Sequence, residues 1–162
     1  MALSKTERLI LMNQYRLLAI LEPDQAEDHE AVREALESGY VAAYEQLFEH
    51  ISDDLTKEEC HFVVDALTVY EALQRAKPDD DSVAFSGFDG NNEAQHLGYL
   101  RYVVKKEGRF DYLKFGGHNF NSHTAMIPIY ERMIAKHQEF GERLELRAHE
   151  VEAIWEARKH PR

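Results

Sequence analysis

The sequence predicts an all-α protein, a single multihelical domain of about seven helices over residues 1–162 with one ordered aromatic loop. Apolar residues recur at helical spacing along most of the chain, whereas strand-like alternation is confined to the short stretch 82–88. Two capping boxes, Ser4-Lys5-Thr6-Glu7 and Thr56-Lys57-Glu58-Glu59, each mark the start of a helix. A chain of 162 residues with 44% hydrophobic residues has the size and composition of one globular domain.

The first predicted helix covers about 5–21, and its apolar residues point in nearly every direction around the helix axis. One small domain can hardly surround such a helix, so this pattern predicts a symmetric homo-oligomer. After a break at Pro23, a polar helix is expected over about 25–38 with Gly39 as its C-terminal cap. A third helix is expected over about 40–50.

The next helix, over about 57–76, follows the second capping box. Asp89 or Asn91 is expected to cap a further helix that runs to the residue before Gly108. Gly98 lies inside that helix, where glycine costs about 1 kcal/mol relative to alanine. We expect the close approach of another segment to compensate for this cost.

Residues 109–123 show no helical pattern, yet a solvated linker would not carry so many aromatic residues, so this loop is expected to pack onto the body. Its aromatic residues are Phe110, Tyr112, Phe115 and Phe120. Thr124 is a candidate cap for the next helix, but Pro128 fits only a first turn, so the start could instead be delayed to about Ile127. A last helix is expected over about 147–158.

The composition excludes several classes of partner. A formal net charge of -11 argues against nucleic acids and against anionic membrane surfaces. The longest apolar run, Leu17 to Leu21, is far shorter than the roughly 20 residues of a membrane span. The run Leu9 to Met12 is likewise too short for a secretory signal. With Cys60 as the single cysteine, these features predict a cytoplasmic protein.

Special-purpose residues crowd into the block from Gly87 to Met133. It contains Gly87-Phe88-Asp89-Gly90-Asn91-Asn92-Glu93-Ala94, Leu97-Gly98-Tyr99-Leu100-Arg101-Tyr102, Glu107-Gly108-Arg109, Gly117-His118-Asn119-Phe120-Asn121, Thr124 and Tyr130-Glu131-Arg132-Met133. Together with Arg8-Leu9-Ile10-Leu11 and Asn13-Gln14-Tyr15 near the start, the block resembles the YfbU family of small bacterial proteins. The resemblance covers most of the chain. It implies an all-helical, self-associating protein and indicates no particular enzymatic reaction.

Six residues of this block are candidates for contacts with a ligand or a partner: Asp89, Glu93, Arg101, Arg109, His118 and Asn121. Gly116-Gly117 would let the backbone approach a ligand closely, and the polar side chains that follow could bind a small polar molecule. The two arginines could hold the loop, form an anion pocket, or pair with the two carboxylates of a neighbouring subunit. Alternatively, all of these side chains satisfy backbone groups of an irregular buried loop.

The sequence predicts no metal, no cofactor and no catalytic residue. Glu58 with His61, and Glu93 with His96, have the spacing of di-iron bundle ligands, but no other helix supplies the bridging carboxylates. Cys60 is expected to be a buried, inert thiol inside a helix. No nucleophile elbow or phosphate-binding glycine loop is present.

The leading functional hypothesis is a non-enzymatic, homo-oligomeric binding or protein-interaction protein, with a protein partner or a small polar ligand as its target. Its working surface would combine the helix of the block with the loop 109–123. The alternative is a small-molecule hydrolase with His118 as general base and Arg101 or Arg109 as electrostatic stabiliser. A third hypothesis is a helical regulatory partner of another protein, which would leave an apolar patch exposed after self-assembly.

Overall fold

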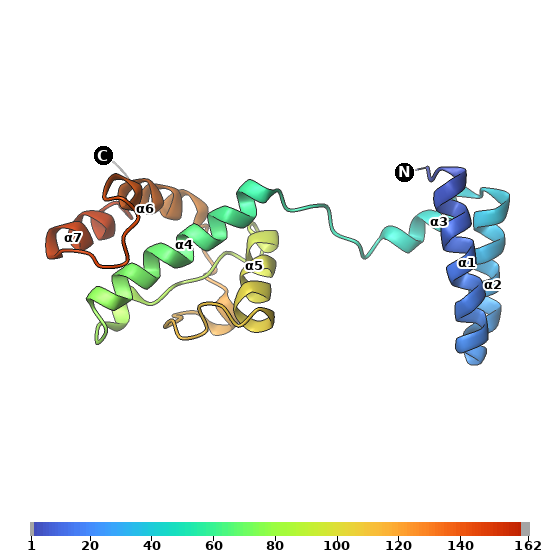
Figure 1. Ribbon diagram of the computed structural model, residues 1–162, viewed down its shortest axis with the longest axis horizontal. Coiled ribbons are helices and arrows are strands. Elements are labelled where there is room, and N and C mark those ends of the chain that lie inside the picture. The colour runs from blue at the N-terminus through green and yellow to red at the C-terminus, as the bar shows by residue number, and fades with distance from the viewer. Residues whose placement is uncertain (1, 160–162) are drawn as a thin grey trace. The chain divides into compact units, whose positions relative to one another are not determined.

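The computed structural model describes residues 2–159 and confirms the all-α prediction (Figure 1). It is 65% helical, with seven α-helices and no strand among the described residues. By their contacts, the residues form two compact units, Met1–Asp54 (unit 1) and Leu55–Arg162 (unit 2). A single domain over residues 1–162 stays a prediction. No helix within the described part of the chain is both long and apolar enough to cross a membrane.

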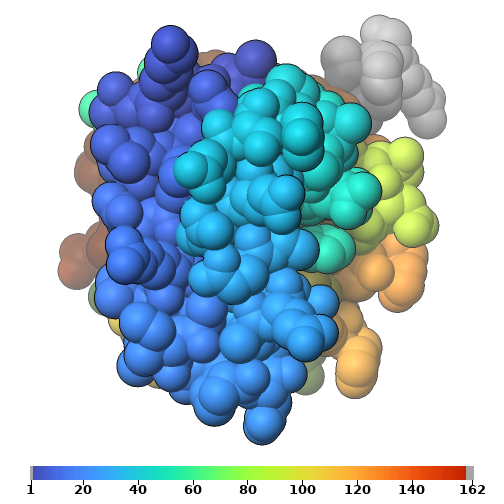
Figure 2. Space-filling view, turned by 90° about the vertical axis from the view of Figure 1, so that its right-hand side faces the viewer, coloured from blue at the N-terminus to red at the C-terminus, as the bar shows by residue number. Residues whose placement is uncertain are grey.

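Unit 1 is built around a pair of antiparallel helices, which run side by side in Figures 1 and 2. Its elements are α1 (Lys5–Leu21), the 3-10 turn η1 (Pro23–Gln25), α2 (Ala26–Ser38), α3 (Val41–Tyr44) and the 3-10 turn η2 (Glu45–Phe48). The predicted capping box starts α1, because the Ser4 hydroxyl accepts from the amide of Glu7 and the Glu7 carboxylate accepts from the amide of Ser4. Gly39 ends α2 in the left-handed conformation, with φ 75°, as predicted.

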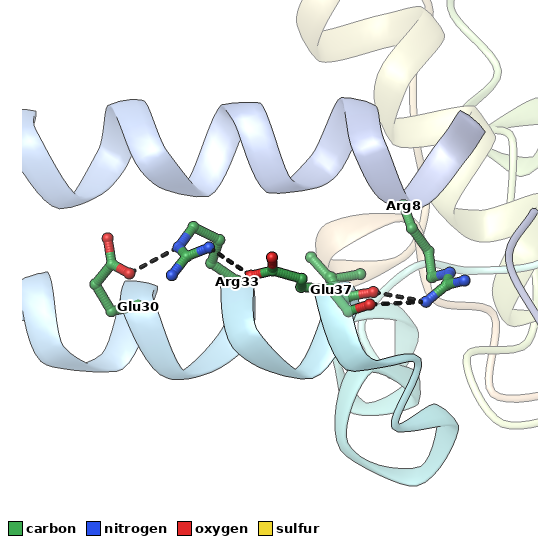
Figure 3. Close-up of polar contacts among 5 residues, drawn as sticks. Arg8, Glu30, Arg33 and Glu37 are labelled. Carbon is green, nitrogen blue, oxygen red and sulfur yellow. Dashed lines mark hydrogen bonds and ion pairs between the residues drawn. The ribbon is translucent and has the colours of Figure 1, made fainter. Parts of the chain in front are cut away.

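The end of α2 is tied to α1 by one arginine (Figure 3). Arg8 of α1 donates to the carbonyls of Leu36 at 2.8 Å and Glu37 at 3.4 Å, which have no partner inside the helix. Along α2, Arg33 lies between Glu30 and Glu37 and pairs with both carboxylates, at 2.7 and 2.8 Å. The Arg8 contacts join the two helices of unit 1, whereas the Arg33 pairs lie within α2.

Unit 1 has a small core. Its buried apolar residues among those described are Ala35, Leu36 and Tyr44, and none of them lies in α1.

The predicted helix over 40–50 is wrong in length, because α3 ends at Tyr44 and continues as the single 3-10 turn η2. Of this segment only Tyr44 is buried, and short helices depend on tertiary packing for their stability.

Unit 2 packs its helices around α4, the longest of them (Figure 1). Its elements are α4 (Lys57–Ala76), η3 (Asp81–Val83), α5 (Ala94–Arg101), the π-helical turn η4 (Tyr102–Lys106), η5 (His118–Phe120), α6 (Ile127–Glu139) and α7 (Ala148–Glu156). The capping box at Thr56 starts α4, as predicted. Pro128 occupies the first turn of α6, so the delayed start at Ile127 is confirmed and Thr124 is not the cap.

Aromatic rings fill the centre of unit 2. Phe85 stacks on Tyr130 at 5.1 Å between ring centroids, and Tyr70 meets Phe85 edge-on at 5.0 Å. Phe85 and Phe88 come from the extended segment after η3, which forms isolated parallel bridges to Phe115 and Asn121. The stretch with strand-like alternation is thus extended and is held to the loop that precedes α6.

The loop 109–123 packs onto unit 2 through three of its four aromatic residues. Phe110, Phe115 and Phe120 are partly buried against the core, whereas Tyr112 is 64% exposed and departs from the prediction.

Cys60 is half-buried, so it is less enclosed than expected, and its thiol lies 3.9 Å from the carbonyl of Leu55.

Two expectations for the helix of the block are wrong. Helix α5 begins at Ala94, so neither Asp89 nor Asn91 caps it; both take part in a tight turn before the helix. Gly98 is exposed, and no atom lies within 4 Å of the position its Cβ would take, so no close approach compensates for it.

We therefore expect Gly98→Ala to raise the free energy of unfolding of unit 2 by about 0.5–1 kcal/mol, because alanine costs less conformational entropy in a helix. The fluorescence of Trp155, the single tryptophan and part of α7, reports this unfolding in urea. Gly87→Ala is the control and should destabilise, since Gly87 has φ 87° and its Cβ would lie 1.8 Å from the carbonyl oxygen of Phe120. An unchanged or lower stability of Gly98→Ala would contradict the prediction.

Candidate functional site

The buried carboxylate of Glu93 connects two distant parts of the block. One oxygen, Oε1, accepts from the amides of Met126 at 2.7 Å and Ile127 at 2.8 Å, at the start of α6. The other, Oε2, accepts from the amide of Asp89 at 2.9 Å. Glu93 is only 5% exposed. A carboxylate at a helix N-terminus satisfies amides that lack a partner in the helix and complements the helix dipole.

Asp89 shapes the turn that leads into α5. Its Oδ1 accepts from the amide of Asn91 at 3.1 Å and its Oδ2 from the side chain of Asn92 at 2.5 Å. These hydrogen bonds, the one from the amide of Asn91 first, lower the pKa of the Asp89 carboxyl below its ordinary value. Asp89 is buried. Its carboxylate is therefore engaged within its own turn.

Asn121 fastens the loop to the same turn. Its Oδ1 accepts from the amides of Gly90 at 3.1 Å and His123 at 3.0 Å. The space around Gly117 is occupied by the chain itself, because its Cβ would lie 2.7 Å from the carbonyl oxygen of Asn121 and 3.1 Å from that of Ser86. Gly117 therefore permits a close approach of backbone, as glycine generally does, but the approaching carbonyl oxygens belong to the protein itself.

Arg101 and Lys105 hold one residue of the loop from the side of α5 and η4. The Arg101 guanidinium donates to the carbonyl of Asn119 from Nε at 3.3 Å and Nη2 at 3.1 Å, and Lys105 donates to the Asn119 side chain at 2.8 Å. Lys105 also lies 5.1 Å from the ring centre of Phe120. Asn119 has φ 56°, a conformation that asparagine tolerates better than most residues.

Arg109 and His118 lie at the exposed surface of unit 2. Arg109 approaches the carboxylate of Glu107 at 3.3 Å and the ring centre of Phe110 at 5.5 Å. No described residue forms a hydrogen bond or ion pair with the His118 ring. The structure therefore joins Asp89, Glu93 and Asn121 through the backbone of one turn, attaches Arg101 to the loop, and leaves these two side chains open to solvent.

The two pairs with di-iron spacing have other surroundings. The Glu93 carboxylate faces backbone amides, while His96 packs between the rings of Phe62 and Phe88, at 5.9 and 5.5 Å between centroids. Glu58 and His61 are both exposed on α4. Within residues 2–159, no group of three or more His, Cys, Asp and Glu side chains is placed to hold a metal ion.

A cleft of 280 Å³ at the C-terminal end of α4 was not anticipated from the sequence. Its lining residues are Glu71, Gln74, Arg75, Pro78, Tyr112, Leu113 and Lys114. Glu71 is buried and accepts from Arg75 Nε at 3.0 Å and Nη2 at 2.7 Å. Gln74 donates to the carbonyls of Val83 and Lys114 and accepts from the amide of Lys114. The sequence signal that could have indicated this cleft is the pair Glu71 and Gln74, two polar residues on the apolar face of a long helix.

We expect Glu93→Gln to lower the free energy of unfolding of unit 2 by about 1–3 kcal/mol, because an amide nitrogen cannot accept from a backbone N–H and leaves a buried donor unpaired. Trp155 fluorescence during urea unfolding measures this loss. Glu131→Gln, at an exposed position of α6, makes the same chemical change and should leave stability unchanged. Equal stabilities for the two variants would show that the Glu93 carboxylate does not hold the turn to α6.

The lowered pKa of Asp89 predicts an acid-sensitive contribution to stability. In the folded state this pKa lies below the unfolded value of about 3.9, so the carboxylate stabilises the fold above that pH. The contribution is lost as the pH falls through the folded-state pKa. We expect the wild-type protein to lose more stability than Asp89→Asn between about pH 6 and about pH 3, measured by urea unfolding. Equal losses would contradict this.

A comparison with known protein families agrees with the resemblance found in the sequence. The model of the YfbU domain matches residues 1–157. This range includes the described parts of both units up to α7, so it contains the exposed helix α1 as well as the Glu93 network. The chain belongs to the YfbU family.

Proposed function

We propose that this protein is a non-enzymatic, self-associating interaction protein whose unit 1 pairs with unit 1 of a second copy. The observation that carries the proposal is an apolar stripe along α1. Its five large aliphatic side chains are 54–74% exposed: Leu9, Ile10, Leu17, Ile20 and Leu21. Contiguous exposed apolar surface of this kind is characteristic of interaction sites.

The stripe lies on one side of α1, and the half-buried residues lie on the other. At 100° per residue, the five side chains fall within an arc of about 120°. The half-buried apolar residues of α1 point in the opposite direction, towards α2: Leu11, Met12, Tyr15, Leu18 and Ala19. Unit 1 therefore covers only one of the two apolar faces of its first helix. This supports the predicted homo-oligomer.

The energy available from the stripe is of the same order as the cost of association. Full burial of one large aliphatic side chain contributes about 1.5–3 kcal/mol. The ten side chains of two copies, each more than half exposed, would contribute on the order of 9–18 kcal/mol. Association costs about 4–15 kcal/mol in lost translational and rotational freedom, so burial of the stripe can drive dimer formation.

Charge favours a second copy as the occupant. Unit 1 has twelve acidic and four basic side chains, so two copies repel each other over most of its surface. No charged residue falls within the arc of the stripe, where the polar residues are Thr6 and Asn13, and Arg16 lies just beyond one edge. Two acidic copies can meet there without placing carboxylates opposite each other.

Unit 2 would provide the surface that such an oligomer presents to a protein partner or a small polar ligand. Arg109 and His118 are the candidates of the block whose side chains remain exposed for this purpose. The hydrolase alternative, with His118 as general base, would need Arg101 to release the carbonyl of Asn119 or would use the exposed Arg109 instead. We favour the interaction protein because the exposed stripe supports it, and we place it in the cytoplasm on account of its single cysteine.

We expect the wild-type chain to have at least twice the mass of one chain in native mass spectrometry. Leu17→Glu should raise the dissociation constant at least about tenfold, because each copy would bury a charge in place of an aliphatic side chain. Tyr102→Glu, at a 52% exposed position of unit 2, is the matched control and should leave the mass unchanged. A monomeric wild-type protein would refute self-association, and dissociation of both variants would refute the role of the stripe.

A further inference from the structure

We infer that the cleft at the C-terminal end of α4 binds a small carboxylic acid with an apolar or aromatic body. The inference goes beyond the proposed function, because it concerns a site within unit 2 and holds whether or not the chain self-associates. The cleft has a volume of 280 Å³, just below the range of about 300–1,000 Å³ that is typical of small-molecule pockets. Such pockets combine apolar walls with a few convergent polar groups, and this cleft has both.

The walls of the cleft are mostly apolar. Leu113 is buried in the core of unit 2, and Pro78 lies just beyond the end of α4. Tyr112, the loop aromatic residue that departs from the prediction of a packed loop, is 64% exposed and lines this cleft instead. An exposed ring beside an apolar wall offers surface that the body of a ligand would cover.

The buried carboxylate of Glu71 orients Arg75 at the cleft. Its Oε1 accepts from Nε of Arg75 at 3.0 Å and from Nη2 at 2.7 Å. Glu71 is 6% exposed, whereas the Arg75 side chain is 56% exposed. A guanidinium carries five N–H donors in one plane, and Glu71 uses only part of them. The remaining donors are held in place by the same contact and can donate to a carboxylate of the ligand.

Lys114 supplies a second cation from the loop side of the cleft. The Gln74 side chain holds its backbone, since Gln74 accepts from the amide of Lys114 at 2.8 Å and donates to its carbonyl at 2.9 Å. The ammonium of Lys114 pairs with Asp81 at 2.7 Å, but the Asp81 side chain is 89% exposed. Exposed ion pairs are weak, so a ligand carboxylate can take the place of Asp81.

The charges that line the cleft favour an anionic ligand. The lining has two cations, Arg75 and Lys114, and one anion, Glu71, whose carboxylate is already paired. The end of α4 opposes an anion, but a helix C-terminus carries only about half an elementary charge. Burial, and then the neighbouring Glu71 carboxylate, raise the pKa of the Tyr112 hydroxyl, which stays protonated near neutral pH. The groups that can still bind a ligand are therefore mainly donors.

Three matched probes test the ligand class. Phenylpropionate, phenylpropylamine and phenylpropanol share one apolar body and differ in charge, and each is titrated against the full chain by saturation-transfer NMR at low and high salt. We expect phenylpropionate to bind most tightly, and less tightly at high salt, because added ions screen the two cations. Equal or tighter binding of the amine, or no binding of phenylpropionate at millimolar concentration, would overturn the inference.

Charge variants at the rim locate the site. Lys114→Gln should raise the dissociation constant of phenylpropionate about two- to fivefold, the effect of losing one exposed ion pair. Asp81→Asn should lower it, because the competitor of the ligand for Lys114 is removed. Lys106→Gln, at an exposed position outside the cleft, is the matched control and should leave the constant unchanged. A rise with Asp81→Asn, or no change with Lys114→Gln, contradicts an anion site.

Arg75 is tested together with Glu71, because Arg75→Gln alone would leave a buried carboxylate without its partner. The double variant Glu71→Gln with Arg75→Gln removes both charges, and Trp155 fluorescence in urea checks that it folds. We expect it to raise the dissociation constant of phenylpropionate at least about tenfold, and undiminished binding would overturn the inference.

The apolar wall is tested without touching the buried pair. Tyr112→Ala, at an exposed position, should weaken the binding of phenylpropionate, whereas Tyr102→Ala, at a 52% exposed position outside the cleft, should not. Equal binding by these two variants would show that the probe lies elsewhere and would overturn the inference. Native mass spectrometry of the same samples reports self-association separately, so failure of the cleft as a site leaves the proposed function standing.

Discussion

The fold of unit 2 depends on the carboxylate of Glu93, which accepts three backbone N–H groups from two segments more than thirty residues apart. A buried amide without a partner costs free energy, and these three have no partner in a helix or sheet. The contact sets the distance between the turn before α5 and the first turn of α6. The aromatic residues Phe88 and Tyr130, which flank these segments, can then meet at 5.3 Å in the core.

Around this carboxylate, the unusual residues of the block act mainly on backbone geometry. Asp89 and Asn121 accept from amides of the same turn, and Gly87 gives the room that the carbonyl of Phe120 requires. Arg101 adds an anchor for the loop at Asn119. The composition that suggested a ligand site is thus accounted for to a large extent by the folding of an irregular loop onto a helical body. An uncovered stripe of five large aliphatic side chains lies elsewhere, on α1.

The sequence was sufficient where the determinants are local. The capping boxes at Ser4 and Thr56 predicted the starts of α1 and α4, and the apolar residues all around α1 predicted its uncovered face. The start of α5 was not predictable, because Asp89 closes a turn only when Glu93 holds its amide. The role of Glu93 itself depends on amides at positions 126 and 127, and no spacing rule connects residues that are so distant in the chain. The same holds for Gln74, which binds the backbone of Lys114.

The small core of unit 1 has a consequence for the behaviour of the protein at different concentrations. With three buried apolar residues among those described, the folding of unit 1 gains little from its own interior, and the proposed pairing would supply the remainder. Its stability would then be a function of protein concentration, while unit 2, with its own aromatic core, would remain folded in the monomer. The amount of protein that a cell makes would determine the fraction of chains with an ordered N-terminal hairpin. Dilution alone would return that hairpin to an open, protease-sensitive state.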